Sequence, residues 1–67
     1  MISKINTSLV YIQKSLKPVS SKSDSTTKSM LLTFNKSDLD ILNNLIKHIP
    51  ANFRMEIGLD KIDLLLY

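Results

Sequence analysis

Apolar residues recur at helical spacing near the middle of the chain. The positions are three or four residues apart, which places their side chains on one face of an α-helix, and they are Leu39, Leu42, Leu45, Ile46 and Ile49. Asp38 and Asp40 put negative charge near the N-terminal end of such a helix, where the helix dipole favours it. Pro50 cannot continue the helix. The pattern therefore predicts a helix over residues 37–49.

Two segments after this helix alternate apolar and polar residues, which is the pattern of a β-strand with one buried face. They cover residues 54–59 and 62–67, and the short Asp60-Lys61 step between them predicts a hairpin. A third alternating segment, residues 30–34, comes before the helix. The second half of the chain is thus predicted as β-α-β-β, an α+β domain of two layers in which one helix packs on a short antiparallel sheet.

The first part of the chain is open to two interpretations. Ile2, Ile5, Leu9, Ile12 and Leu16 follow a spacing of three and four residues, which favours a helix. Residues 1–17 contain no Ala or Glu and several β-branched residues, so their helix propensity is poor. Residues 9–12 equally suit a strand that pairs with residues 30–34, and the fold would then be ββαββ.

Residues 18–29 separate this segment from the predicted core. Five serines and two threonines stand among these twelve residues, and Val19 is the one strongly apolar side chain. This composition predicts a flexible linker. The whole chain, residues 1–67, is expected to form one small domain with its folded core in residues 30–67.

A chain of 67 residues buries only about 60% of the surface that its unfolded form exposes, so its stability is marginal. Small domains often gain stability from disulfides, a metal or a partner chain. The sequence contains no cysteine, so a protein partner or self-association is the expected source. The side chains predicted to form the core are Leu39, Leu42, Ile46, Ile49, Ile57 and Leu64.

The net charge of +3 is unevenly distributed. Residues 1–36 hold six lysines and one aspartate, a balance of +5, and residues 37–67 hold three basic and five acidic residues, a balance of −2. A basic segment can bind nucleic acid through its phosphates. The lysines that would do so are Lys4, Lys14, Lys17, Lys22 and Lys28. Proteins that bind single-stranded nucleic acid usually also have aromatic side chains that stack on the bases. Within residues 1–33, Tyr11 is the only aromatic residue.

Residues typical of catalytic or metal sites are scarce. His48 is the only histidine, and its position in the last helical turn suits a surface cation near the helix C-terminus. Asp60 and Asp63 flank a turn without the alternating acidic pattern of a calcium loop. We therefore expect no enzyme activity, no catalytic residue, no cofactor, no metal and no small-molecule substrate.

The last predicted strand carries more apolar surface than one helix can cover. Leu65 and Tyr67 fall on the face away from the helix, where they either attract another chain or lie beneath the N-terminal segment. The sequence carries no specific family motif. We predict a small protein-binding module, such as an inhibitor, adaptor or accessory subunit, with contacts through Tyr11, Leu65 and Tyr67.

Two alternatives remain open at this point, a nucleic-acid-binding protein and a homo-oligomeric structural protein. Ile, Leu, Lys, Asn and Ser dominate the composition, which is common in proteins encoded by AT-rich DNA. A viral or mobile-element origin would suit such a composition in so small a chain. No apolar run reaches the 18 or so residues that a membrane span requires. The expected location is the cytoplasm, because the chain lacks cysteine and its acid-free residues 1–23 lack the arginine favoured in organellar presequences.

Overall fold

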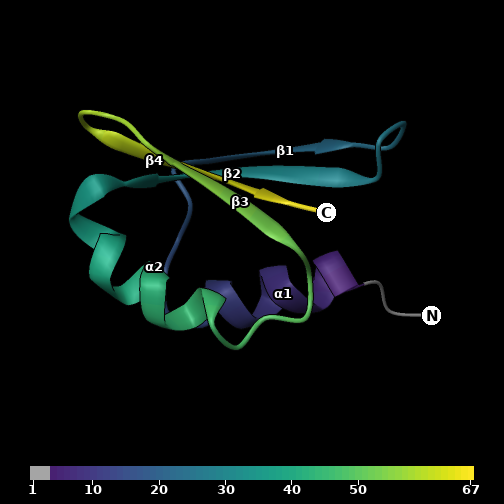
Figure 1. Cartoon of the computed structure of the whole chain (residues 1–67), viewed down its shortest axis with the longest axis horizontal. Coiled ribbons are helices and arrows are strands. Elements are labelled where there is room, and N and C mark those ends of the chain that lie inside the picture. The colour runs from purple at the N-terminus through teal and green to yellow at the C-terminus, as the bar shows by residue number, and fades with distance from the viewer. Residues whose placement is uncertain (1–3) are drawn as a thin grey trace.

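Two helices and a four-stranded sheet make up the computed structural model, which describes residues 4–67 (Figure 1). Along the chain the elements are α1 (Lys4–Gln13), β1 (Ser20–Asp24), β2 (Ser29–Asn35), a 3-10 turn (Lys36–Asp38), α2 (Leu39–Ile46), β3 (Phe53–Ile57) and β4 (Lys61–Leu66). The strands lie in the order β1-β2-β4-β3 and every neighbouring pair is antiparallel. Both helices lie on the same side of the sheet. The predicted α+β class with helix and sheet layers is confirmed.

Within the N-terminal segment, residues Lys4–Gln13 form α1, so the strand alternative and its pairing with residues 30–34 are wrong. Ile2 of the predicted apolar seam lies outside the described residues. Ile12 and Leu16 are buried in the core, and Ile5 and Leu9 pack against it. These residues lie on one side of α1 and its C-terminal turn, as their spacing predicts. Burial of this apolar face compensates for the poor helix propensity of the segment.

Residues 18–29, predicted as a flexible linker, contain β1 and the turn that joins it to β2. β1 pairs with β2 along its whole length, from Ser20 opposite Thr33 to Asp24 opposite Ser29. All five side chains of β1 are exposed, so the strand lacks the apolar alternation from which strands are predicted. The sheet and α2 therefore do follow a ββαββ order, but the first strand is the Ser-rich segment and not residues 9–12.

The predicted elements of the second half are present with shifted ends. The predicted helix over 37–49 begins as the 3-10 turn and ends as α2 at Ile46. The hairpin turn lies one or two residues earlier than predicted, and the N–H of Gly58 donates to the carbonyl of Lys61 at 2.8 Å. A Cβ atom on Gly58 would lie 3.1 Å from that oxygen, so a glycine suits this tight approach.

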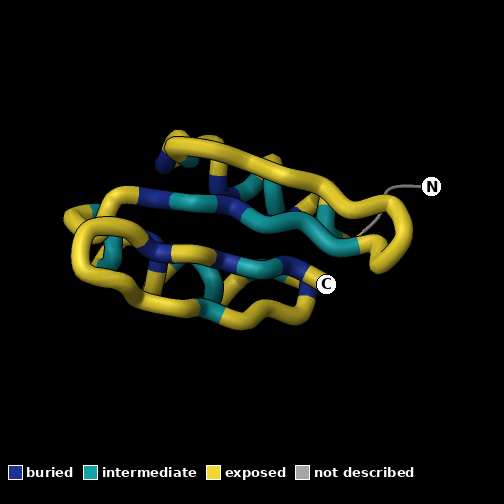
Figure 2. The backbone as a smooth tube through the Cα atoms, turned by 90° about the horizontal axis from the view of Figure 1, so that it is seen from above, coloured by how far each residue is buried: buried dark blue, intermediate teal, exposed yellow. Residues whose placement is uncertain are grey.

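The core lies between the sheet and the two helices. Its fully buried side chains from the sheet come from the two central strands, as Figure 2 shows, and are Leu32, Phe34, Ile62, Leu64 and Leu66. Leu42 of α2 is also fully buried, whereas Leu39, Ile46 and Ile49 pack partly buried against the core. The prediction of Ile57 as a core residue is wrong. Its side chain is 54% exposed because β3 is an outer strand of the sheet.

Candidate binding surface

Leu65 and Tyr67 lie on the face of the sheet that neither helix covers. Alternation along β4 directs Ile62, Leu64 and Leu66 toward the helices, so Leu65 and Tyr67 point to the other side. This open face consists of the outward residues of the four strands. Leu65 is half-buried among its neighbours and Tyr67 is 50% exposed. Their placement on the face away from α2 agrees with the sequence pattern.

The backbone of Tyr67 is held in the sheet. Its N–H donates to the carbonyl of Asn52 at 2.9 Å, and the N–H of Asn52 donates to the carbonyl of Tyr67 at 3.0 Å. This pair extends the ladder between β3 and β4 by one residue on each strand. The aromatic side chain therefore projects from an ordered position at the end of the sheet.

One row of residues runs across all four strands of the open face. The register places Lys22 opposite Leu31, Leu31 opposite Leu65, and Leu65 opposite Arg54. Residues directly opposite each other on antiparallel strands have their side chains on the same face and in contact range. The row therefore has two leucines at its centre and a cation at each end.

The neighbouring row is polar and acidic. Thr33, Asp63 and Glu56 stand opposite one another on β2, β4 and β3, and the hydroxyl of Thr33 donates to a carboxylate oxygen of Asp63 at 3.0 Å. A shallow depression between the two rows is lined by Leu31, Arg54, Glu56, Asp63 and Leu65. The open face thus offers an apolar centre bordered by charges of both signs.

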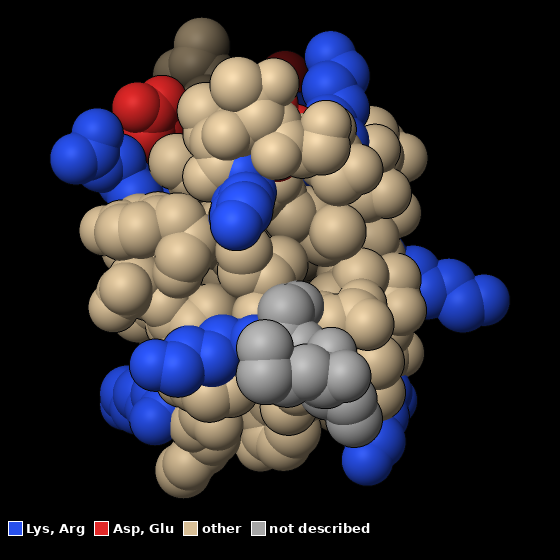
Figure 3. Space-filling model, turned by 90° about the vertical axis from the view of Figure 1, so that its right-hand side faces the viewer, with Lys and Arg blue, Asp and Glu red and all other residues tan. Residues whose placement is uncertain are grey.

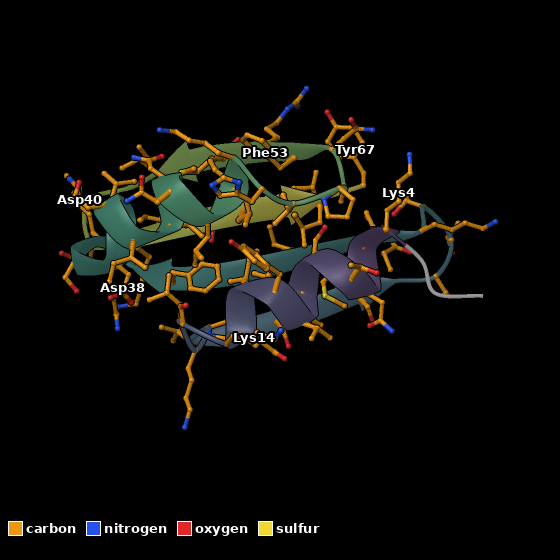
Figure 4. The ribbon with its side chains drawn as sticks, turned by 90° about the horizontal axis from the view of Figure 1, so that it is seen from below. Lys4, Lys14, Asp38, Asp40, Phe53 and Tyr67 are labelled. Atoms are coloured by element: carbon orange, nitrogen blue, oxygen red, sulfur yellow. The ribbon has the colours of Figure 1, made fainter. Side chains whose placement is uncertain are left out.

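α1 does not cover this apolar centre. α1 packs beside α2 on the opposite face of the sheet (Figures 1 and 4), where Ile12 contributes to the core. Of the two outcomes expected for Leu65 and Tyr67, the structure shows the uncovered one within residues 4–67.

Tyr11, the third residue predicted to contact a partner, lies elsewhere. It is half-buried on α1, in the helix layer, and its ring packs edge-on against the ring of His48 with the centroids 6.4 Å apart. This contact joins α1 to the residues that follow α2. Tyr11 and the pair Leu65 and Tyr67 therefore belong to opposite faces of the molecule.

The five lysines proposed to contact phosphates do not form one surface. Lys4 and Lys14 stand at opposite ends of α1 in Figure 4, about 15 Å apart along the helix axis at 1.5 Å per residue. Lys22 is on the open face of the sheet and Lys28 is in the turn before β2. Lys17 lies between α1 and β1. Figure 3 shows basic side chains scattered over one end of the molecule, with uncharged atoms and some acidic side chains among them.

The acidic residues and His48 are similarly dispersed. Asp24 accepts hydrogen bonds from the backbone N–H groups of Thr26 and Thr27 at 2.9 and 3.4 Å, while Asp38 and Asp40 stand at the start of α2. Within residues 4–67, no three side chains among His, Asp and Glu come together as metal ligands.

The sequence did not predict that Lys22, Leu31 and Arg54 share one row with Leu65, although Lys22 was a candidate for phosphate contact. Each strand's alternation shows which residues share a side of that strand. The strand order and register determine which strands lie together, and nothing in the residues of β1 indicates that Lys22 is in a strand.

No protein-family model, curated protein or solved structure is significantly similar to this chain. None of the helices in the described part of the chain has the length and apolar character needed to cross a membrane.

Proposed function

We propose that this chain is a non-enzymatic protein-binding module, acting as an inhibitor, adaptor or accessory subunit, and that it contacts its partner through the open face of its sheet. The observation that carries the proposal is the position of Leu31, Leu65 and Tyr67 on a face that neither α1 nor α2 covers. Aromatic residues and arginine are enriched in protein interfaces, and Arg54 lies opposite Leu65 on this face.

The charges around the two leucines indicate what kind of partner segment would fit. Lys22 and Arg54 stand at the two ends of the leucine row. An apolar side chain of the partner would contact Leu31 and Leu65, with acidic groups on either side of it to meet the two cations. Such complementarity contributes to specificity and to the association rate. We therefore expect a partner segment that is apolar at its centre and acidic at its flanks.

The structure provides less support for binding of nucleic acid. The lysines of the first half are spread over the helix layer, the open face and the turn before β2. Phosphate contacts increase affinity when several cations bind the backbone of the same nucleic acid. In this structure the lysines instead point in different directions. Retention on a phosphate matrix that falls steeply with salt would favour this alternative over the proposal.

Affinity capture from host extract with matched variants tests the proposal. Leu65→Ser combined with Tyr67→Ser alters the open face, while Val10→Ser combined with Ile41→Ser alters exposed apolar residues of the two helices. We expect the helix variant to retain the partners of the wild-type chain and the open-face variant to lose them at least about tenfold. Circular dichroism establishes that both variants are folded. Equal retention by the two variants would contradict the proposal.

A further inference from the structure

The free edge of β3 differs from the free edge at the other side of the sheet. β1 and β3 are the two outer strands, and in Figure 2 β1 is exposed along its whole length while β3 is exposed except at the half-buried Met55. β1 carries only Ser, Lys and Asp, which discourage pairing with another chain. On β3, by contrast, Phe53 is 40% exposed and Ile57 is 54% exposed. An edge with unpaired backbone groups and apolar side chains is a template for a further strand.

The ladder between β3 and β4 determines which backbone groups of β3 are free. Asn52 and Tyr67 exchange both of their backbone hydrogen bonds. In an antiparallel ladder such pairs alternate with pairs that exchange none, so Arg54 and Glu56 also direct their N–H and C=O groups toward β4. The residues whose backbone groups point to the free edge are therefore Phe53, Met55 and Ile57.

We propose that the free edge of β3 binds a second copy of this chain, in an antiparallel pair whose two-fold axis passes midway between the Met55 residues of the two copies. Met55 then stands opposite Met55 of the second copy, and Phe53 stands opposite Ile57 of the second copy. Each of these pairs exchanges both backbone hydrogen bonds, because all three residues direct these groups outward. The two sheets become one continuous sheet, with the helices of both copies on the same face.

The side chains complement each other in this register. Phe53 and Ile57, which are exposed in the single chain, meet on the face that carries the helices. On the open face Arg54 stands opposite Glu56 of the second copy, and Glu56 stands opposite its Arg54. These charged residues form pairs without backbone hydrogen bonds, in which opposing side chains lie closest. Opposite charges at such positions stabilise a strand pair.

Other registers are disfavoured by the same residues. A shift of two residues in one direction places Arg54 opposite Arg54, and a shift in the other direction places Glu56 opposite Glu56. Like charges directly opposite destabilise a strand pair. A shift of one residue would turn the apolar side chains to the wrong face and misalign the free hydrogen-bonding groups. Charge and backbone geometry therefore favour the proposed register over its neighbours at shifts of one and two residues.

Charge reversal gives a test that depends on this register. In a homodimer of Arg54→Glu, two acidic side chains stand opposite each other at both charged positions, and in a homodimer of Glu56→Arg two basic side chains do so. When the two variants are mixed, the heterodimer has an acid opposite a base at both positions. Mass is measured by sedimentation equilibrium over micromolar to millimolar concentrations, with Lys22→Glu on the other outer strand as the matched control.

We expect the wild-type chain and Lys22→Glu to reach twice the monomer mass of 7.6 kDa. Each variant alone should dissociate with a constant at least about tenfold higher, and their equimolar mixture should regain the dimer. A wild-type chain that remains monomeric at millimolar concentration would overturn the proposal. So would dimers of both variants with unchanged affinity, or a mixture that stays monomeric.

Amide hydrogen exchange provides a second measurement that does not require a variant. In the dimer the N–H groups of Phe53, Met55 and Ile57 are hydrogen-bonded, so their exchange should slow as protein concentration rises. The N–H groups of Arg54 and Glu56 bond to β4 in both states and should show no such dependence. Rapid, concentration-independent exchange at the first three residues would contradict pairing at this edge.

Discussion

The hydroxyl oxygen of Ser8 accepts a hydrogen bond from the backbone N–H of Ala51 at 3.1 Å. The same hydroxyl donates to the carbonyl of Lys4 at 2.7 Å. Ser8 is completely buried and Ala51 nearly so, and both are small, which lets α1 approach the loop between α2 and β3 closely. Ser8 therefore provides the hydrogen-bond partner of a backbone N–H group that has no access to water.

Replacing Ser8 by Ala should destabilise the domain, because it leaves the buried N–H of Ala51 without an acceptor. An unsatisfied buried donor costs about 1–3 kcal/mol, and the higher helix propensity of Ala offsets up to about 0.5 kcal/mol of this. We expect the free energy of unfolding in urea to fall by about 1–2 kcal/mol. Ser25→Ala in the exposed turn is the control. Equal effects of the two substitutions would show that the bond contributes nothing.

Lys28 has a φ angle of 53° and is the only residue other than glycine with a positive φ in the described part of the chain. It ends the turn between β1 and β2, where the strand direction reverses. A non-glycine residue in this conformation is destabilised by about 1–2 kcal/mol. A substitution by glycine would remove this cost, but the greater flexibility of glycine in the unfolded chain would offset part of the stability gained.

We therefore expect Lys28→Gly to raise the free energy of unfolding by about 0.5–1 kcal/mol, and Lys28→Val to lower it. Thermal unfolding followed by circular dichroism measures both. Ser25→Gly, in the same turn at a negative φ, should give no increase. A Lys28→Gly variant no more stable than the wild-type chain would argue against the positive φ.

Leu42 and Ile41 are adjacent on α2 but differ in environment. Leu42 is completely buried, whereas 47% of the surface of Ile41 is exposed. Truncation of a buried leucine to alanine costs about 2–5 kcal/mol, which is a large part of the total stability of a domain this small. We expect Leu42→Ala to unfold a large share of the molecules at 25 °C and Ile41→Ala to lower stability by less than about 1 kcal/mol. Similar midpoints in urea would contradict the helix orientation.

Local sequence signals were sufficient for the elements with strong apolar periodicity. α2 combines a stripe around Leu42 with acidic residues at its start and Pro50 after its end, so several independent cues agree. β4 alternates from Ile62 to Leu66 over a buried face. The ends of these elements lie one to three residues from their predicted positions. This shift arises because the 3-10 turn and the hairpin depend on contacts with distant parts of the chain. One example is the hydrogen bond from the N–H of Lys36 to the carbonyl of Asp60.

β1 could not be predicted because its sequence contains no apolar alternation. Its strand conformation comes from pairing with β2 and from the turn in which Asp24 accepts bonds from Thr26 and Thr27. The sequence does contain a signal for the turn, in residues 24–27, because an aspartate that precedes Ser or Thr residues often begins such a turn. Ile57 was predicted to be buried and is exposed. Alternation indicates on which side of a strand a residue lies, but not whether a helix covers that residue.

The candidate surface was predicted in part. Alternation in the last strand was enough to place Leu65 and Tyr67 on the face away from α2. The neighbours of Leu65 depend on the strand order β1-β2-β4-β3, which brings Leu31 and Arg54 from distant parts of the chain. That order follows from tertiary packing and has no local signal.

Site-specific photocrosslinking tests the central claim most directly, because it reports which face touches a partner. A benzophenone amino acid is placed at Tyr67 on the open face or at Val10 on α1, two positions with similar exposure of 50% and 53%. Irradiation in host extract should give a discrete crosslinked protein from the Tyr67 position and none from the Val10 position. Crosslinks from Val10 alone, or none from Tyr67, would contradict the assignment of the open face as the binding surface.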